Sequence, residues 1–417
     1  MECSPLHRGH VYLLEEARRL TGADYLLVVL GGDFMQRGIP AVIDRHARTR
    51  ALLASGADLV LELPVYYSCA AAGYFAMGGV SLLDSIGVVT ELAFGSESGE
   101  PEALLHTAGL LLQETPSFQG ELRSGLSAGL SWPAARSRAY LNSTGSALPS
   151  GPNDVLGIEY LKALHALDSP IRPCVIQRIP SASATQLRRQ LEDSTSLPDS
   201  PDGDAPLPPE IPAAMQAELA ASRGISSPVF PYDLSAELGW TLHSLAADET
   251  RSCHEQSLLL RRYIDVSPAL ADRILALRGQ YRSFTDFCER LKTRDLTYTR
   301  ISRALLHIPL GMRQEMLEDC LAGGVTGYAR VLGFRREAAP LLGAIQGSAR
   351  VPLITKPAAQ IQSLSPAFQT LMHEEMRIAR LYRCVCARKY SGRYPYPIRS
   401  EFSVPLDIPS CGSSPSR

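Results

Sequence analysis

The sequence lacks the features that define several classes of protein. Its nine cysteines form no C-x-x-C pair, and no apolar run approaches the roughly 18 residues that a membrane-spanning helix needs. A net charge of −2 indicates no polyanionic partner, so any nucleic-acid surface has to be a local patch. These absences argue against a zinc ribbon, a disulfide framework and a membrane protein. We expect reduced thiols in a cytoplasmic protein with no evident protein partner.

The first part of the chain alternates short apolar runs with helical segments. Runs of this kind are typical of strands that are buried on both faces, and helices between them favour parallel pairing. We therefore predict an α/β fold, a doubly wound parallel sheet followed by an α-helical region. The expected strands are Tyr25–Leu30, Leu59–Leu63 and Val88–Phe94, and the expected helices are His10–Leu20, Asp44–Ser55 (capped by Asp44) and Gly78–Ile86.

Composition divides the 417 residues into four segments. Residues 1–192 are expected to form the α/β domain, and residues 193–212, rich in Pro, Ser and Asp, to form a linker. Residues 213–323 have no strand-like run and are expected to be helical. Residues 324–417 form a C-terminal region that ends in a small polar tail.

Two histidines flank a glycine at the predicted start of the first helix, in Pro5-Leu6-His7-Arg8-Gly9-His10. A helix N-terminus offers free N–H groups to phosphate, and a glycine lets the ligand approach the backbone. Imidazoles placed there can donate hydrogen bonds to phosphoryl oxygens as charge develops. The alternative is an ordinary loop with two surface histidines. No nearby Cys, Asp or Glu completes a zinc site, so we expect no resident metal.

A second anion-binding pattern lies in Ser183-Ala184-Thr185-Gln186-Leu187-Arg188. Ser183 and Gln186 have the spacing of a capping box, which predicts a helix start. Thr185 adds a hydroxyl there, and Arg188 lies one turn further on. The alternative is a capped helix with a solvated arginine. Two such helix starts in one domain favour a shared site for an extended polyphosphate.

Together the motifs resemble a known family, the tRNA(Met) cytidine acetate ligases of the HxGH nucleotidyltransferase superfamily. The resemblance extends over nearly the whole chain. It is carried by residues 2–10 (ECSPLHRGH), 32–38 (GDFMQRG), 57–64 (ADLVLELP), 94–97 (FGSE), 152–157 (PNDVLG), 299–303 (TRISR), 305–308 (LLHI) and 329–334 (ARVLGF).

The resemblance implies an ATP-dependent ligase that forms acetyl-adenylate and acetylates the wobble cytidine of elongator tRNA(Met). Acetate is then the co-substrate, and Mg²⁺ accompanies ATP. His7 and His10 match the catalytic histidines. The implied ATP-binding residues are Glu2, Cys3, Ser4, Pro5, Leu6, His7, Arg8, Gly9, His10, Gly95, Asn153, Arg178, Ile179, Ser183, Thr185 and Arg188.

Three departures from the family pattern stand out. The family has a complete apolar strand before the loop, whereas here only Met1 and Glu2 precede Cys3, so we expect a start upstream or a truncated chain. The loop with Tyr-His-Asp that the family places before Ser183 is shortened here. Ser4 replaces a usual Asn.

Asp33 follows a predicted strand, at the rim where α/β proteins bind ligands. We expect it either to hold magnesium or a substrate group, or to be an ordinary turn residue after two glycines. Asp58 and Glu62 flank a buried strand and are expected to be structural.

Two basic stretches are candidate RNA contacts. Arginine grips phosphate and tyrosine stacks on splayed bases, although a charge run is often only a solvated face. Within these stretches Arg300, Arg303, Arg380 and Arg383 are the RNA candidates. The first stretch comprises Arg290, Lys292, Arg294, Arg300 and Arg303, and the second Arg377, Arg380, Arg383, Arg388, Lys389, Arg393 and Arg399, with Tyr382, Tyr390, Tyr394 and Tyr396 among them.

Two other functions stay open from the sequence. One is an adenylyltransferase that acts on a small phosphate ester or mononucleotide. The other is an RNA-binding protein whose nucleotide site is degenerate. Pyrophosphate release that depends on acetate separates the first from the ligase, and absent ATP binding with intact tRNA binding would favour the second.

Overall fold

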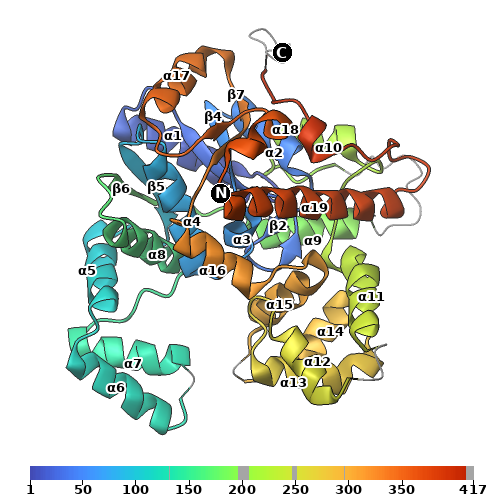
Figure 1. Ribbon diagram of the computed structural model, residues 1–417. Coiled ribbons are helices and arrows are strands. Elements are labelled where there is room, and N and C mark those ends of the chain that lie inside the picture. Colours follow the sequence, from blue (N-terminus) through green and yellow to red (C-terminus); the bar gives the residue numbers. More distant parts are fainter. Residues whose placement is uncertain (131, 196–205, 247–250, 295, 410–417) are drawn as a thin grey trace.

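The computed structural model describes the chain except for residues 131, 196–205, 247–250, 295 and 410–417. Half of the predicted linker and nearly all of the predicted tail therefore lie outside the described residues. Figure 1 shows strands at the centre of the molecule with helices around them. Two helical groups, α5 to α7 and α11 to α14, extend from this body towards the bottom of the view.

The central sheet has four strands in the order β1, β4, β7, β8. Its outer pairs, β1 with β4 and β7 with β8, are parallel, whereas β4 and β7 are antiparallel. The antiparallel pair arises because β7 belongs to the C-terminal region, which joins the sheet from the opposite direction. The strands are β1 (Leu27–Gly31), β4 (Leu59–Leu63), β7 (Ala329–Phe334) and β8 (Leu353–Ile354).

Two smaller strand pairs complete the β-structure of the described chain. The parallel pair β5 (Glu91–Ser96) and β6 (Arg172–Gln177) lies beside the central sheet, and β2 (Phe34–Met35) and β3 (Ile39–Pro40) form an antiparallel hairpin. The predicted strands in 25–30, 59–63 and 88–94 correspond to β1, β4 and β5, so the parallel-dominated α/β fold is confirmed.

Helices cover both faces of the central sheet, as a doubly wound fold requires. Every residue of β4 is buried. Val60 packs in one apolar cluster with α1, α2 and α9, whereas Leu59 and Leu61 pack in another with α4 and α17. Strands buried on both faces need continuous apolar runs, and this is what the sequence has there. The helices up to the linker are α1 (Arg8–Thr21), α2 (Arg45–Ala54), α3 (Val65–Ser68), α4 (Ala72–Ser85), α5 (Pro101–Leu112), α6 (Pro116–Ser127), α7 (Trp132–Thr144), α8 (Pro152–Ala166) and α9 (Ala184–Thr195).

The segment 213–323 is helical, as predicted, with no named strand among its described residues. It contains α10 (Ala213–Ser222), α11 (Ser235–Ala246), α12 (Cys253–Leu260), α13 (Pro268–Leu277), α14 (Phe284–Leu291), α15 (Tyr298–Leu310) and α16 (Gln314–Ala322). The C-terminal region adds α17 (Ala339–Ser348), α18 (Pro357–Gln360) and the 24-residue α19 (Pro366–Lys389).

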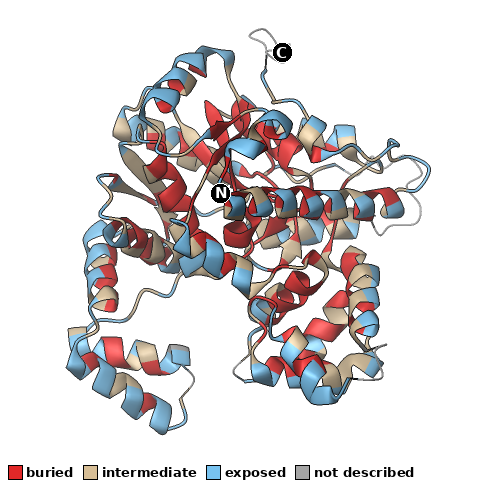
Figure 2. Cartoon of the chain, viewed as in Figure 1, coloured by how far each residue is buried: buried red, intermediate tan, exposed pale blue. Residues whose placement is uncertain are grey.

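The predicted segments share one apolar core. Residues from α3, from α11 to α16 and from α19 pack in a single buried cluster. Figure 1 shows α19 running between the sheet and the helices α11 to α15, and its side towards the body is buried in Figure 2. The predicted division into domains stays a prediction. Within the described part of the chain, however, the sheet and the helical segment are joined by contacts through α19 and β7.

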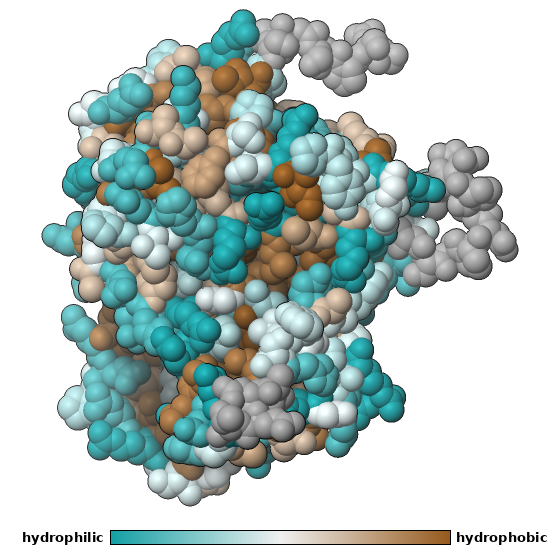
Figure 3. All heavy atoms as spheres, turned by 45° about the vertical axis from the view of Figure 1, so that its right-hand side comes forward, coloured by the Kyte–Doolittle hydropathy of each residue, from teal (hydrophilic) through white to brown (hydrophobic). Residues whose placement is uncertain are grey.

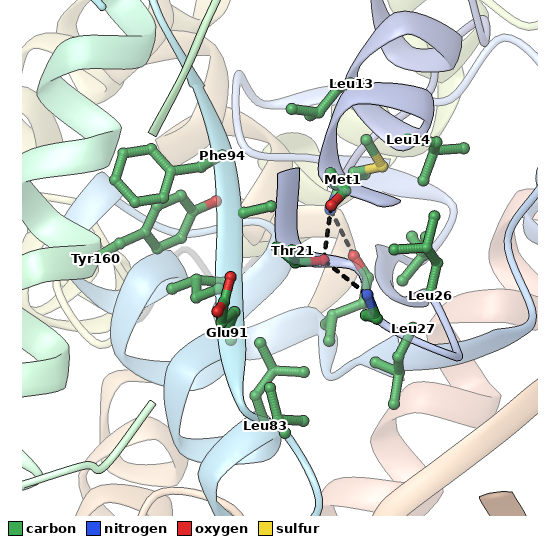
Figure 4. A pocket seen from close by; sticks show the side chains of 18 of the residues that line it. Met1, Leu13, Leu14, Thr21, Leu26, Leu27, Leu83, Glu91, Phe94 and Tyr160 are labelled. Atoms are coloured by element: carbon green, nitrogen blue, oxygen red, sulfur yellow. Dashed lines mark hydrogen bonds between the residues drawn. The ribbon is translucent and has the colours of Figure 1, made fainter. Parts of the chain in front are cut away.

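A cavity of about 660 Å³ separates β1 from β5. Apolar side chains line it, among them Leu13, Leu27 and Phe94, and Figure 4 shows them on opposite sides of the space. Met1 lies at its edge: its amino group donates to Val29 O (2.5 Å), and Gly31 N donates to Met1 O (2.9 Å). These two bonds are those of one residue in a parallel strand beside β1.

The eight cysteines that the structure describes are free thiols. None of the described helices is long and apolar enough to cross a bilayer. The face drawn in Figure 3 is mostly hydrophilic, with apolar side chains scattered among polar ones.

Candidate nucleotide site

The first motif forms the start of α1. His7 is the N-cap in an extended conformation, and its Nδ1 accepts a hydrogen bond from Gly9 N (3.1 Å). In return His10 Nδ1 accepts from His7 N (3.2 Å), so the two imidazoles form a capping box with the backbone. The ring centroids are 3.9 Å apart. The local fold therefore holds both rings side by side at a helix N-terminus.

These hydrogen bonds set the tautomer of both rings. A nitrogen that accepts from a backbone N–H carries no proton, so the proton of each neutral ring is on Nε2. Each Nε2–H is then the donor that His7 or His10 can offer to a ligand. The motif thus presents two donors rather than two bases.

Both histidines are neutral at physiological pH. Burial, together with the positive charges of Arg178 and Arg188, lowers the pKa of His7 to about 4. Burial also holds the pKa of His10 well below its ordinary value, and the neighbouring His7 adds to that shift. A neutral imidazole that donates through Nε2 can hydrogen-bond an anionic oxygen without carrying a charge of its own, which burial would penalise.

The second motif lies at the start of α9, and its predicted capping box is confirmed. Gln186 N donates to Ser183 Oγ (3.2 Å), and Ser183 N donates to Gln186 Oε1 (2.8 Å). Arg188 Nη2 donates to Thr185 Oγ1 (2.9 Å), so the guanidinium lies over the first turn.

The two motifs meet although they are about 180 residues apart in the sequence. Arg188 Nη1 donates to Ser4 O (2.9 Å), which ties α9 to the loop before α1. Between them is a cavity of about 280 Å³. Its lining consists of Glu2, His7, Gly9, His10, Tyr12, Leu13, Arg37, Gly95, Asn153, Ile176, Gln177, Arg178, Ile179, Ser183, Ala184, Thr185 and Arg188.

The third side of the cavity is built at the ends of β5 and β6. Glu97 follows β5 and caps α8, because its Oε2 accepts from Asn153 N (2.9 Å) and Asp154 N (3.0 Å). Its Oε1 accepts from Asn153 Nδ2 (2.6 Å) and from Arg178 Nη1 (3.1 Å). Glu97 therefore holds both Asn153 and Arg178 at the rim, at the carboxyl ends of two parallel strands where α/β proteins bind ligands.

Several residues of the first motif do not line the cavity. Cys3, Ser4, Pro5 and Leu6 are buried behind the loop, whereas Arg8 is exposed. Ser4 Oγ accepts from Val42 N (3.0 Å), and burial raises the pKa of the Cys3 thiol to about 11. These side chains shape the loop. Their contact with ATP stays a prediction, and for the four buried residues it would have to be made by the backbone.

The structure argues against Asp33 as a ligand for substrate or metal. Its side chain is buried and lines neither strand-end cavity. Oδ2 accepts from Arg45 Nη2 (2.7 Å) and Nε (3.0 Å), and Oδ1 accepts from Arg45 N (2.8 Å). The rule that ligands bind at the carboxyl ends of parallel strands pointed to the correct end of the strands. The Asp33 carboxylate, however, is occupied by its ion pair with Arg45. Asp58 and Glu62 also form ion pairs, with Arg18, Arg45 and Arg330.

Arg37, Tyr12 and Gln177 also line the cavity, although no pattern in the sequence singles them out as site residues. Arg37 lies at the tip of the β2–β3 hairpin, inside a stretch that carries the family resemblance. Its charge alone did not distinguish it from the other 40 lysines and arginines of the chain.

Ion pairs occupy part of the predicted RNA surface. Arg303 is half-buried and donates through Nε to Asp265 Oδ2 (2.5 Å), so it does not share an open face with Arg300. Arg383 donates to Arg399 O (2.6 Å) and pairs with the buried Glu401. Arg300 and Arg380 are exposed.

The chain matches one family over most of its length. The sequence model of the family described as HIGH Nucleotidyl Transferase matches residues 1–394. The tRNA(Met) cytidine acetate ligase of Acetivibrio thermocellus is 33% identical over 398 residues, which cover 92% of this chain and 93% of that protein. The tRNA(Met) cytidine acetate ligase of Fervidobacterium nodosum is 35% identical over 368 residues, with coverage of 85% and 82%.

A solved structure has the same fold throughout. The crystal structure of Thermotoga maritima TmcAL bound with alpha-thio ATP superposes with a TM-score of 0.83 at 28% sequence identity. The superposition covers 98% of this chain and 97% of that one. The similarity therefore includes the β-strands, the helical segment and the C-terminal region.

Proposed function

The chain belongs to the HIGH nucleotidyl transferase family, and we propose that it is an ATP-dependent tRNA(Met) cytidine acetate ligase. The observation that carries the proposal is the cavity between the two motifs. Two neutral imidazoles and a guanidinium-bearing helix start surround one space of about 280 Å³. Relatives that match this chain over most of their length are named tRNA(Met) cytidine acetate ligase, and the Thermotoga maritima TmcAL structure that superposes on it is bound with alpha-thio ATP.

The first step of the proposed reaction joins acetate to ATP. A carboxylate oxygen of acetate forms a bond to the α-phosphorus, and the bond from that phosphorus to the bridging oxygen of the β-phosphate breaks. Acetyl-adenylate and pyrophosphate result. Because phosphoryl transfer is catalysed mainly by position and charge, His7 and His10 act as Nε2–H donors to phosphate oxygens. Arg178 and Arg188 neutralise the phosphates.

In the second step the exocyclic amine of the wobble cytidine attacks the acetyl carbon. The C–N bond forms as the bond to the adenylate oxygen breaks, AMP leaves, and the nitrogen loses one proton. The cavity lining contains a single carboxylate, Glu2, and Gln36 N donates to its Oε1 (2.6 Å). We assign the proton to no side chain.

The residues that line the cavity limit how a magnesium ion could be held there. Mg²⁺ binds oxygen ligands and commonly keeps several waters while it is held by one or two carboxylates and by substrate phosphates. Glu2 is the one carboxylate in this lining, and no cluster of metal-ligating side chains occurs among the described residues. A magnesium ion here would arrive with the phosphates of ATP and neutralise their charge.

For the tRNA, we propose contacts through the exposed Arg300 of α15 and Arg380 of α19. Replacing each with alanine should weaken tRNA binding about equally for different sequences. Each replacement should also reduce the slope of log affinity against log salt by about one, if the side chain contacts a phosphate.

The test of the proposed function uses ATP, labelled acetate and transcribed tRNA(Met). The full chain should transfer label to the tRNA and release pyrophosphate only when acetate is present. His7→Ala should lower the rate about a hundredfold to a thousandfold, the usual effect of losing one preorganised donor. His254→Ala, an exposed residue of α12 outside the lining, is the matched control. Pyrophosphate release by the wild-type protein that does not depend on acetate would contradict the proposal.

A further inference from the structure

Arg37 extends into the cavity from an element that neither motif contains. It lies between β2 and β3, at the tip of their hairpin, and its Nη1 donates to Thr185 Oγ1 (3.3 Å). The residue is exposed, and no described carboxylate lies within ion-pair distance of its guanidinium. Its charge is therefore available to a ligand in the cavity.

Two guanidinium groups converge on one hydroxyl. Thr185 Oγ1 accepts from Arg188 Nη2 (2.9 Å) as well as from Arg37. Burial, opposed by the charge of Glu2 and reinforced by the positive charge of Arg37, lowers the pKa of Arg188 to about 10. The two positive charges repel each other at this distance. An anion bound between them would attract both guanidinium groups and offset that repulsion.

The surroundings of this pair favour an anion with many oxygens. Ser183, Ala184 and Thr185 at the start of α9 line the same cavity, and the first turn of a helix offers backbone N–H groups to an anion. Ser181 Oγ is buried without a hydrogen-bond partner, and it lies so close to Gly9 that a Cβ there would be 2.9 Å from it. A carboxylate offers two oxygens to these donors, whereas a diphosphate offers enough for both arginines and the helix start.

The hairpin that carries Arg37 is held by the helical segment. Gly38 has a φ of 73°, and an added Cβ would lie 2.2 Å from Arg303 N, so the tip packs directly on α15. Ser302 Oγ donates to Gly38 O (2.7 Å). This anchoring places the Arg37 backbone in a defined position, which reduces the ordering that binding would otherwise require.

We propose that Arg37 binds the β- and γ-phosphates of ATP and then the pyrophosphate that they become. The inference rests on the proposed function, because that function supplies the pyrophosphate. Arg37 and Arg188 share the leaving group, and His7 and His10 remain at the phosphate where the bond changes occur. The hairpin thus makes α15 of the helical segment part of the nucleotide site.

Binding of inorganic pyrophosphate to the full chain tests this without acetate or tRNA. Calorimetric titration should show binding to the wild type, and Arg37→Gln should weaken it about tenfold to a hundredfold, as expected for the loss of one charge-assisted hydrogen bond. Arg37→Lys should recover part of the affinity because it keeps the charge without the planar fork. Arg19→Gln is the control, since Arg19 is an exposed arginine of α1 that pairs with Glu16.

Equal pyrophosphate affinity in the wild type and in Arg37→Gln would overturn the inference. A raised KM for acetate in Arg37→Gln with unchanged pyrophosphate affinity would also overturn it, because that would place the guanidinium at the carboxylate. Failure of the proposed function is a different result. It would be a wild-type protein that binds pyrophosphate through Arg37 but forms no acetyl-adenylate, and the anion site would then stand by itself.

Discussion

Because the histidines of the nucleotide site are buried and neutral, they should stay active in acid well below the pH at which an ordinary imidazole is protonated. The pKa of His7 is about 4, against an ordinary value of 6.5. At pH 5.5 an imidazole with a pKa of about 4 is protonated in roughly 3% of molecules, whereas an ordinary one is protonated in roughly 90%. The two cases therefore differ about thirtyfold in protonation at a pH that can be measured directly.

The same shift has a consequence for stability. A histidine whose pKa is lower in the folded state stabilises the fold above its unfolded pKa, and that contribution is lost as pH falls. For His7 the loss should begin near pH 6.5 and be complete below about pH 4. A shift from 6.5 to about 4 corresponds to about 3 kcal/mol, as an order of magnitude. His10 should add to this loss in the same direction, because its pKa is also lowered.

The assay is a titration of the imidazole carbon-bound protons by NMR, with assignments from His7→Asn and His10→Asn. Arg188→Gln removes one of the charges that lower the pKa of His7, so that pKa should rise in this variant. Acetate-dependent pyrophosphate release at saturating ATP should remain near its plateau at pH 5.5. A His7 resonance that titrates near pH 6.5 in the folded protein would refute the reasoning, because the imidazole would then be solvated.

Three further predictions follow from the fold. Hydrogen bonds to Asp407 and Glu401 outweigh burial and raise the pKa of His46 to about 9, so about 3 kcal/mol of stability should be present below pH 6.5 and lost as pH rises through about 9. Urea unfolding should show this loss in the wild type and not in His46→Gln. Arg330→Met leaves the buried Glu62 and Glu401 each without one partner and should cost about 3–5 kcal/mol in the same assay. An apolar extension of about five residues before Met1 should fill the cavity beside β1 and raise the urea midpoint of unfolding. An unchanged midpoint would show that the added residues do not pack in the cavity.

Short stretches of sequence were enough to predict the strands that are buried on both faces and the starts of several helices. Each strand buried on both faces is a short apolar run, and Leu59–Leu63 matches β4 at both ends. Asp44 caps α2 as expected, because its carboxylate accepts from His46 N and Ala47 N. The site motifs were found for the same reason, since both histidines and Ser183 occupy helix starts, which have recognisable spacing.

The sequence predicted that the two motifs share a site, but it did not predict several other features that depend on distant contacts. The run Ala329–Phe334 was used only as part of a family resemblance, and nothing in it specified pairing with β4, which lies about 270 residues earlier. Arg37 was missed because a hairpin tip becomes part of a site only when α9 lies opposite. A ligand role for Asp33 stayed open beside a turn role because the sequence does not show that Arg45 occupies its carboxylate.

The loop of the first motif is held from behind by a buried arginine. Arg48 is fully buried, and its guanidinium donates to four backbone carbonyls. They belong to Glu2 in the loop, to Gly31 and Gly32 at the end of β1, and to Ile43 before α2. One side chain thus ties the loop to the end of the neighbouring strand.

Next to Arg48 a chain of buried ion pairs continues into the C-terminal region. Arg45 pairs with Glu62, and Glu62 pairs in turn with Arg330 of β7, whose Nη2 donates to Glu401 Oε1 (2.7 Å). A buried charge that loses its partner is strongly destabilising, so these residues depend on each other. Residues 1–192 alone would therefore leave Glu62 short of one partner and β4 without β7. For this reason the nucleotide site and the C-terminal region should fold as one unit, wherever the boundary in sequence composition lies.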